Sequence, residues 1–395
     1  MQELENVANV IEANMSGPLS GLKIIEFSGI GPGPMCAMIL ADLGATVLRI
    51  DRKQPEVLGI PRPLKYNTLL RNRQVINLDL KDPVAVSLVL ELIENADALI
   101  EGFRPGTMER LGLGPERCLE VNPAIVYGRM TGWGQKGPLA PYAGHDINFL
   151  SITGVLDAIG KPGEAPTVPL NIVGDYAGGS LYLAVGILAA LFSARDTRVG
   201  QVVDAAIVDG VANLSATFFG MVAGGLWRQQ RKSNIVDGGA PFYDCYECLD
   251  GKYVSVGPVE PKFFAQLLQA LELAQDFRGI QNDRESWPEI RQALRARFKM
   301  KTRDEWADLL SLSDVCVTSV LTFDEAKNHP HMQARGTYIE VDGVVQPAPA
   351  PRFSVTQPDL PTPPQAYSPE KAEETLSKWI QLERINSYRS LGVLD

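Results

Sequence analysis

The feature that most constrains the fold is a strand, a helix and a second strand in immediate succession near the start of the chain. The apolar run "LKIIEFS" (22–28) has the composition of a buried strand, "PMCAMILADLGA" (34–45) that of a helix, and "TVLRID" (46–51) that of a second strand. Strands joined by a helix run parallel, because the crossover returns the chain to the same edge of the sheet. The segment therefore predicts a βαβ unit.

The same alternation continues along the chain. The runs "QVINLDL" (74–80), "ALIEGF" (98–103) and "AIVYGRMTGW" (124–133) are typical of strands, and a helical segment over 82–95 and a short helix before Gly112 separate them. Successive units of this kind build a doubly wound sheet with helices on both faces. We expect an α/β fold with a large Rossmann-like domain and a mostly parallel sheet.

Changes in composition predict how the chain divides into domains. A polar linker separates the large domain from about a hundred residues of alternating hairpin, helix and strand, and a Pro-rich extended segment follows. We expect a flexible N-terminal extension over 1–16, the large domain over 17–205, a linker helix over 206–234, a small α+β domain over 235–335, and a return segment over 336–395 whose C-terminal helix (370–388) packs on the large domain.

Two helices are apolar enough to raise the question of a membrane. The first, over 178–194, spans about 25 Å at about 1.5 Å per residue, which is short of a hydrocarbon core of about 30 Å. The second, over 204–227, carries Asp204 and Asp209. We expect both to be buried core helices, and we expect no membrane insertion.

Charge and cysteine content exclude several classes of protein. A formal net charge of −10 argues against a nucleic-acid partner. Five cysteines, an odd and sparse set, suit the reducing cytoplasm, where we expect the protein to act. Cys245 and Cys248 lie in the first strand of a predicted β-hairpin that turns at Asp250-Gly251. Residues three apart on a strand point to opposite faces, so we expect the two thiols to point away from each other. With no second cysteine pair, we expect no metal site.

Three stretches in the middle of the chain resemble one known family. "GRMTGWGQKGP" (128–138), "YAGHDINF" (142–149) and "NIVGDYAGG" (171–179) are similar to the family III CoA-transferases, and within them to the members that racemise 2-methylacyl-CoA thioesters. The resemblance spans nearly the whole chain from Gly17 onward. It implies an interlocked homodimer, each chain with a large CoA-binding domain and a small domain. It also implies an isomerase, a racemase or epimerase that inverts C2 of a branched acyl-CoA by 1,1-proton transfer through an enolate.

Inversion at C2 places a clear demand on the site. It needs a base on one face of the carbon and a conjugate acid on the other, and the two exchange roles in the reverse reaction. A histidine and a carboxylate suit this pair, because both can titrate near neutrality in a suitable environment. The resemblance assigns these roles to His145 and Asp175. Taken alone, His145 would be interpreted as a turn residue and Asp175 as a helix N-cap.

Three more residues are expected to assist the two bases. Asn171, one helical turn before Asp175, resembles the asparagine that partners the aspartate in the family's racemases, and as a hydrogen-bond donor it would set the protonation of that carboxyl group. The resemblance assigns Glu260, from the partner's small domain, to orienting and charging His145, and a nearby carboxylate would raise the basicity of the imidazole. The sequence after His145 is typical of a loop that leads into a helix, so the backbone N–H of Asp146 is expected to face the thioester oxygen and stabilise the enolate.

CoA itself requires positive charge. It carries a pyrophosphate, a 3′-phosphate and adenine, so an acidic protein must concentrate arginines to bind it. The candidates, placed at the carboxyl ends of the predicted strands, are Arg52, Arg71, Arg73, Arg104 and Arg110. The resemblance supports Ile30, Arg52, Leu78, Leu80, Arg104 and Arg110 as CoA neighbours, with Pro32 beside the same path. The loop "SGIGPGP" lacks the third glycine of a dinucleotide fingerprint. We expect no cofactor, since CoA is part of the substrate.

Two other functions stay open at this point. A CoA-transferase of the same family would use Asp175 as a nucleophile that carries the acyl group. A CoA-binding scaffold without catalysis is the third candidate, against which the joint presence of His145, Asp175 and Glu260 argues. For a racemase, the sequence is compatible with a branched fatty acyl chain, a bile-acid or sterol side chain, or an aryl-propionyl group.

Overall fold

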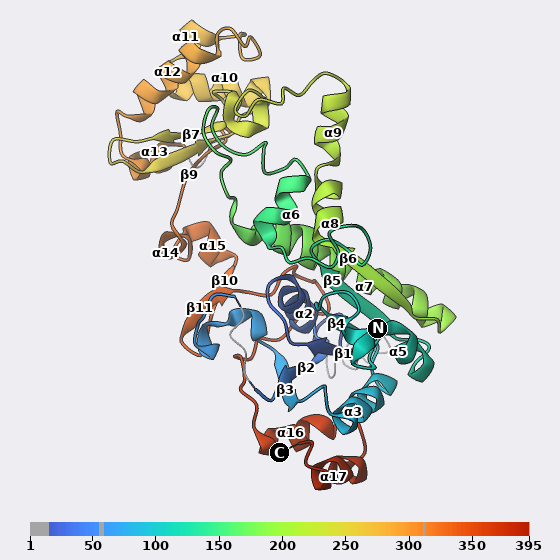
Figure 1. Cartoon of the computed structure of the whole chain (residues 1–395). Coiled ribbons are helices and arrows are strands. Elements are labelled where there is room, and N and C mark those ends of the chain that lie inside the picture. Colours follow the sequence, from blue (N-terminus) through green and yellow to red (C-terminus); the bar gives the residue numbers. More distant parts are fainter. Residues whose placement is uncertain (1–15, 55–58, 311–312, 395) are drawn as a thin grey trace, which may run out of the picture. The chain divides into compact units, whose positions relative to one another are not determined.

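The computed structural model describes residues 16–54, 59–310 and 313–394 (Figure 1). The chain divides into two compact units, which are described separately below. The described part of the first unit comprises 16–54, 59–153, 170–214 and 334–394, and that of the second comprises 154–169, 215–310 and 313–333. The extension expected over 1–16 lies outside the described residues except for Ser16.

Six strands form one parallel sheet in the first unit. They are β1 (Lys23–Phe27), β2 (Thr46–Arg52), β3 (Arg73–Leu78), β4 (Ala98–Glu101), β5 (Val126–Thr131) and β6 (Gln201–Ala206). Their order, β3-β2-β1-β4-β5-β6, is that of a Rossmann-type sheet. Every neighbouring pair is parallel, so the carboxyl ends of all six strands meet at one edge. The predicted α/β fold is confirmed.

Helices and short helical turns connect these strands. They are α2 (Pro32–Asp42), η1 (Leu64–Tyr66), η2 (Thr68–Leu70), α3 (Pro83–Glu94), α4 (Thr107–Arg110), α5 (Pro115–Val121), α6 (Asp146–Ile152), η3 (Leu170–Ile172), η4 (Val173–Leu181), α7 (Tyr182–Thr197) and α8 (Ile207–Leu214). One face of the sheet packs against α3 and α5, and α2 lies on the other, where the Pro34 carbonyl meets Arg73. The sheet is therefore covered on both faces.

One apolar core joins the C-terminal segment to the sheet. The helices α16 (Pro369–Leu376) and α17 (Leu382–Ser390) share a buried cluster with the strands and α3, and lie beside α3 in Figure 1. The single helix expected over 370–388 is wrong. The chain turns between α16 and α17, because Trp379 and Ile380 bury their side chains in the same core from the turn. A short antiparallel pair, β10 (Tyr338–Val341) and β11 (Val344–Pro347), precedes these helices.

Arg71 and Arg73 lie at the opposite edge of the sheet from the one expected. They stand where β3 begins, not where a strand ends. Arg73 is buried against Glu26, with Nε and Oε2 3.0 Å apart, and donates to the Pro34 carbonyl at 2.6 Å. Arg71 pairs with Asp42 at 2.5 Å, and both side chains are 3% exposed. Structural pairs occupy both guanidinium groups, so their prediction as CoA ligands is wrong.

The apolar segment after β5 differs from the helix expected over 204–227. Residues 204–206 complete β6, then α8 follows, and Ser215 separates it from α9 (Ala216–Ala223). None of the residues of α9, all of them described, is buried. A buried core helix was therefore the wrong expectation for α9. The expectation over 178–194 holds for one face of α7 only, because Val185 and Phe192 on that helix are 66% and 74% exposed.

One stretch of helix also passes a simple test for a membrane span. The run Leu170–Thr197 is long and apolar enough to cross a bilayer, judged by length and composition. Core helices of proteins without any membrane segment pass the same test, and part of this run is buried. The finding is weak support for a membrane segment.

The second unit is built on a small antiparallel sheet. Its strands β7 (Asp244–Glu247), β8 (Tyr253–Val256) and β9 (Val317–Ser319) pair in that order. The remaining elements are α9, η5 (Ile235–Gly239), α10 (Pro261–Ala270), α11 (Ala274–Phe277), α12 (Trp287–Phe298), α13 (Arg303–Leu310), α14 (Phe323–Ala326) and α15 (Pro330–Ala334), whose last residue begins the next stretch of the first unit. The predicted hairpin is confirmed, with Cys245 exposed and Cys248 buried.

The buried pair Arg73–Glu26 generates a stability prediction. Arg73→Met is expected to lower the free energy of unfolding by about 3–5 kcal/mol, because it leaves the Glu26 carboxylate buried without its partner. Thermal unfolding followed by circular dichroism measures the change. Arg117→Met, which breaks an exposed pair with Glu120, is the control and should be nearly neutral. Unchanged stability of Arg73→Met would contradict the structural role.

Candidate active site

His145 stands at the start of α6 in a loop shaped by close packing. Its backbone is extended, and its N–H donates to Asn148 Oδ1 at 3.0 Å. Gly144 has no room for a side chain, because an added Cβ would lie 2.7 Å from the Phe149 ring and 2.8 Å from Trp133. These two rings meet edge to face, with centroids 4.7 Å apart. The packing fixes the backbone beside His145, while the histidine itself is exposed.

Asp175 lies in the first turn of η4, which is a π-helix. Such helices are rare and frequently occur at functional sites. Glycines let other elements pack directly on its backbone: a Cβ on Gly210 of α8 would lie 1.9 Å from the Gly178 carbonyl oxygen. The Ser180 hydroxyl bonds with the carbonyls of Pro32, at 2.9 Å, and Asp175, at 3.1 Å. The helix that carries Asp175 is thereby attached to α2 and α8.

The carboxylate of Asp146 caps this π-helix. Its Oδ1 accepts the backbone N–H of Asp175 at 2.7 Å, and the carboxylate also accepts the N–H of Gly174. The cap position itself is Ile172, and Asp175 is the third residue of η4. The alternative interpretation of Asp175 as an N-cap is therefore wrong.

Asn171 and Asp175 form the hydrogen bond that the sequence suggested. Asn171 Nδ2 donates to Asp175 Oδ2 at 3.2 Å. Burial raises the pKa of the Asp175 carboxyl group above its ordinary value, and the negative charge of Asp146 acts in the same direction. The hydrogen bond from Asn171 and the proximity of His145 partly oppose this rise. The net result is a carboxyl group that holds its proton more strongly than an exposed aspartate does.

The loop after β1 reaches the same carboxyl group. Gly31 has φ +65°, and an added Cβ there would lie 3.1 Å from Asp175 Oδ2. A side chain at this position would be strained and would crowd the carboxylate. The loop that follows β1 therefore connects Asp175 to the carboxyl edge of the sheet.

The residues predicted to hold CoA lie along that edge. They are Ile30 after β1, Arg52 at the end of β2, Leu78 and Leu80 at the end of β3, Arg104 after β4, and Arg110 at the end of α4. Ile30 and the three arginines are exposed. The side chain of Leu78 is 1% exposed and belongs to the core, so only its backbone can face a ligand. Arg110 donates to Thr107 Oγ1 at 3.0 Å.

A buried ion network beside this edge was missed at the sequence level. Arg129 of β5 donates through Nε to Glu101 Oε1 and through Nη1 to Glu109 Oε1, both at 2.8 Å. Glu101 also accepts the Phe103 N–H at 2.8 Å. The network ties the loop that carries Arg104 to the sheet. The sequence signal that could have revealed the network is the arginine inside the otherwise apolar strand "AIVYGRM".

Glu260 belongs to the second unit. It occupies the N-cap position of α10 and is exposed. Burial raises the pKa of the Cys316 thiol, and the charge of Glu260 adds to that rise. Its assignment to His145 stays a prediction. Within the described ranges, no three His, Cys, Asp or Glu side chains gather as a metal site would require.

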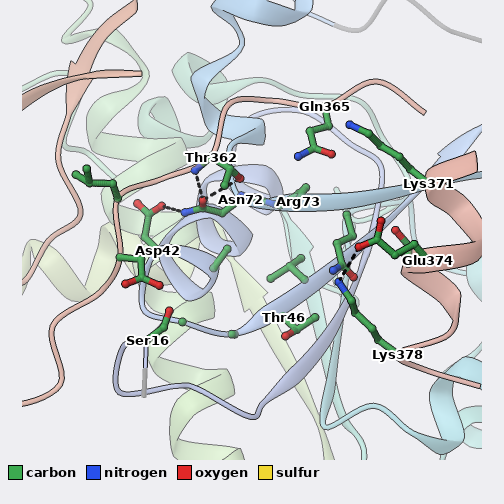
Figure 2. A pocket seen from close by; sticks show the side chains of 18 residues that line it. Ser16, Asp42, Thr46, Asn72, Arg73, Thr362, Gln365, Lys371, Glu374 and Lys378 are labelled. Atoms are coloured by element: carbon green, nitrogen blue, oxygen red, sulfur yellow. Dashed lines mark hydrogen bonds and ion pairs between the residues drawn. The ribbon is translucent and has the colours of Figure 1, made fainter. Parts of the chain in front are cut away.

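A polar pocket of about 590 Å³ lies at the other edge of the sheet (Figure 2). It is lined by the starts of β2 and β3, the end of α2 and the segment from Asp359 to Lys378. Asn72 bonds there with Thr362, and Asp42 is occupied by Arg71. Of the residues predicted for catalysis or CoA binding, only Arg73 lines it, and that guanidinium group is already paired with Glu26. Ligands of α/β sheets bind at the carboxyl edge instead.

Comparison with known proteins identifies the family. The sequence matches CoA-transferase family III over residues 19–375, so the chain belongs to that family. It is 42% identical over 333 residues to the alpha-methylacyl-CoA racemase of Mus musculus, covering 84% of this chain and 85% of the relative. The human racemase is also 42% identical, over 334 residues, with 84% and 86% covered. The acetyl-CoA:oxalate CoA-transferase of Acetobacter aceti is 32% identical over 349 residues, with 85% and 89% covered.

Solved structures support the fold. A CAIB/BAIF family protein from Brucella suis superimposes with a TM-score of 0.78 at 24% identity, covering 92% of this chain and 99% of that one. At this identity the likeness concerns the fold alone.

The bond from Asn171 generates a pH prediction. Asn171→Ala removes a hydrogen bond that favours the ionised carboxylate, so the pKa of Asp175 is expected to rise further. In the direction in which Asp175 accepts the proton, the acid limb of the rate profile should move to higher pH. The α-proton exchange rate of an acyl-CoA, measured against pH, tests this. Asn95→Ala, which removes an exposed bond at the end of α3, is the control. An acid limb that does not move would show that Asn171 does not control the protonation of Asp175.

Proposed function

We propose that this chain is a 2-methylacyl-CoA racemase, an isomerase that inverts C2 of a branched acyl-CoA thioester. The observation that carries the proposal is the joining of His145 and Asp175, residues far apart in the sequence, through the Asp146 contact to the backbone of Asp175. Similarity to two racemases over most of the chain supports the same activity.

The proposed chemistry is a 1,1-proton transfer. The thioester carbonyl acidifies the hydrogen on C2, and one base removes that proton while its electron pair moves into an enolate. The conjugate acid on the other face then returns a proton to C2, and the carbonyl reforms. For one enantiomer the His145 imidazole takes the proton and the Asp175 carboxylic acid supplies one; for the other the roles exchange. The raised pKa of Asp175 helps because its acid form must be available for donation.

The enolate oxygen requires a hydrogen-bond donor. The backbone N–H of Asp146, at the first position of α6, makes no hydrogen bond to any described residue. We assign this group to the thioester oxygen. A donor of this kind typically contributes about 3 kcal/mol to the transition state, comparable to an acid–base contribution of about 10²–10⁴-fold.

The CoA part of the substrate is assigned to the carboxyl edge of the sheet. Arg52, Arg104 and Arg110 supply positive charge there for the phosphates. Ile30, Leu80 and the backbone of Leu78 complete the proposed contact. No other cofactor enters the reaction, because the thioester itself supplies the acidity of C2. The unpaired cysteines suit a cytoplasmic enzyme.

A homodimer completes the proposal. Val185 and Phe192 of α7 and Leu181 at the end of η4 are exposed, and in the second unit Phe219 and Val222 of α9 are exposed as well. Exposed apolar side chains such as those of α7 can mark an interaction site, and we assign them to contact with a second copy of the chain. In that dimer Glu260 of one chain would orient and charge His145 of the other.

A CoA-transferase is the second candidate, because a relative with that activity is 32% identical over 349 residues. There Asp175 would attack the thioester carbon, expel CoA thiolate and carry the acyl group as a mixed anhydride. The two functions differ in one measurable product: the transferase forms a covalent acyl-aspartate, whereas the racemase exchanges the C2 hydrogen with solvent.

Proton NMR of (2R)- and (2S)-2-methylacyl-CoA in deuterated buffer tests the racemase. The wild type should exchange the C2 hydrogen of both enantiomers and interconvert them. His145→Ala should abolish exchange from the face that the imidazole serves, while exchange from the other face can persist. Equal loss on both faces would make His145 structural. Acyl-aspartate trapped by hydroxylamine, with acyl transfer to a second carboxylic acid and no C2 exchange, would favour the transferase.

Sedimentation velocity tests the dimer. The wild type should sediment as a dimer, and Val185→Glu together with Phe192→Glu should shift it toward the monomer, because buried carboxylates would lose hydration without a partner. Lys299→Glu, a change of charge on an exposed lysine of the second unit, is the control. A monomeric wild type would refute this part of the proposal.

A further inference from the structure

The two proposed bases come from different elements, and one side chain joins them. His145 precedes α6, and Asp175 lies in η4, so no local segment fixes their separation. Asp146, the residue bonded to His145, is 9% exposed and places Oδ1 2.7 Å from the backbone nitrogen of Asp175. The same carboxylate accepts the Gly174 N–H. Hydrogen bonds from backbone N–H groups to an ionised acceptor are short and strong.

The Asp146 carboxylate packs directly against the backbone of Gly174 in η4. A Cβ on Gly174 would lie 2.3 Å from Asp146 Oδ1, so the carboxylate occupies the space of the missing side chain. On the other side, Asn148 holds the backbone of His145. The connection from His145 to Asp175 is therefore held by hydrogen bonds at both ends, at the backbone N–H of His145 and at that of Asp175.

We propose that the side chain of Asp146 is a positioning residue that fixes His145 and Asp175 on opposite sides of the substrate carbon. The inference rests on the proposed function and adds to it a role for the side chain, separate from that of the backbone N–H of the same residue. A side-chain oxygen acceptor is needed rather than any small residue, because it must accept two N–H groups at once.

The charge of Asp146 gives this role a second, measurable effect. Among the described residues, the charged groups that act on the Asp175 carboxyl are Asp146 and His145, while η3 contributes the neutral Asn171. The other elements packed on η4, namely α2, α7, α8, β5 and β6, add no further charge effect. Because the negative charge of Asp146 raises the pKa of Asp175, removing that charge should lower it.

Three variants test the proposal by α-proton exchange with a 2-methylacyl-CoA. Asp146→Ala removes both accepted bonds, and Gly174→Ala displaces the carboxylate while leaving it in the chain. Both should lower kcat by about 10²-fold, the cost of a misplacement of about 1 Å, with KM little changed. Asp146→Asn keeps the shape and loses the charge, so its acid limb should move to lower pH in the direction in which Asp175 accepts the proton.

Asp97→Asn is the matched control, because that carboxylate accepts the Lys23 backbone N–H, also at 2.7 Å, where β1 begins. It should leave kcat and the pH profile unchanged. Normal kcat in Asp146→Ala and Gly174→Ala, or an unmoved acid limb in Asp146→Asn, would overturn the proposal. So would failure of all three to fold, since Asp146 would then serve stability. A wild type without exchange activity would instead reject the proposed function.

Discussion

The arrangement of the site depends on the contact between the Asp146 carboxylate and the start of η4. Without it, the loop of His145 and the helix of Asp175 would meet only through apolar packing, which fixes volume better than it fixes the direction of a polar group. Two backbone N–H groups pointing at one carboxylate define an orientation as well as a distance. The glycine at 174 is the matching requirement in the sequence, because any side chain there would push the carboxylate away.

The arginines at the two edges of the sheet have different surroundings. At the amino edge, Arg71 pairs with Asp42 and Arg73 pairs with Glu26. These ion pairs hold the strands and α2 together. At the carboxyl edge, Arg52, Arg104 and Arg110 are exposed, and the buried Arg129 network supports the loop that presents one of them. The proposed binding of CoA to an acidic chain thus relies on exposed arginines at one edge, while the arginines at the other edge are buried in structural pairs.

The sequence predicted the sheet well, because each strand carries its own apolar run and helical segments separate the runs. It singled out His145, Asn171 and Asp175 through motifs that are local in the chain, and the structure joins the last two by a hydrogen bond. It failed where a tertiary contact decides the outcome. Arg71 was assigned to a ligand because its partner Asp42 lies on another element. Asp175 was interpreted as the N-cap of its helix because Asp146, whose carboxylate accepts the N–H groups at the start of η4, lies 29 positions away. Residues 204–206 were assigned to a helix, since their strand forms only against β5.

The same framework can serve either activity of the family, and the environment of Asp175 favours proton transfer. A nucleophilic carboxylate must be ionised when it attacks, whereas an acid–base partner must visit both protonation states. Burial and the neighbouring Asp146 raise the pKa of Asp175, which favours the protonated state, and Asn171 limits that rise. A raised pKa is in the direction that the proposed reaction needs, in which Asp175 must also act as an acid. In the proposed reaction the exposed imidazole of His145, at the start of α6, would be the second proton carrier, and the covalent transferase route has no step that requires one.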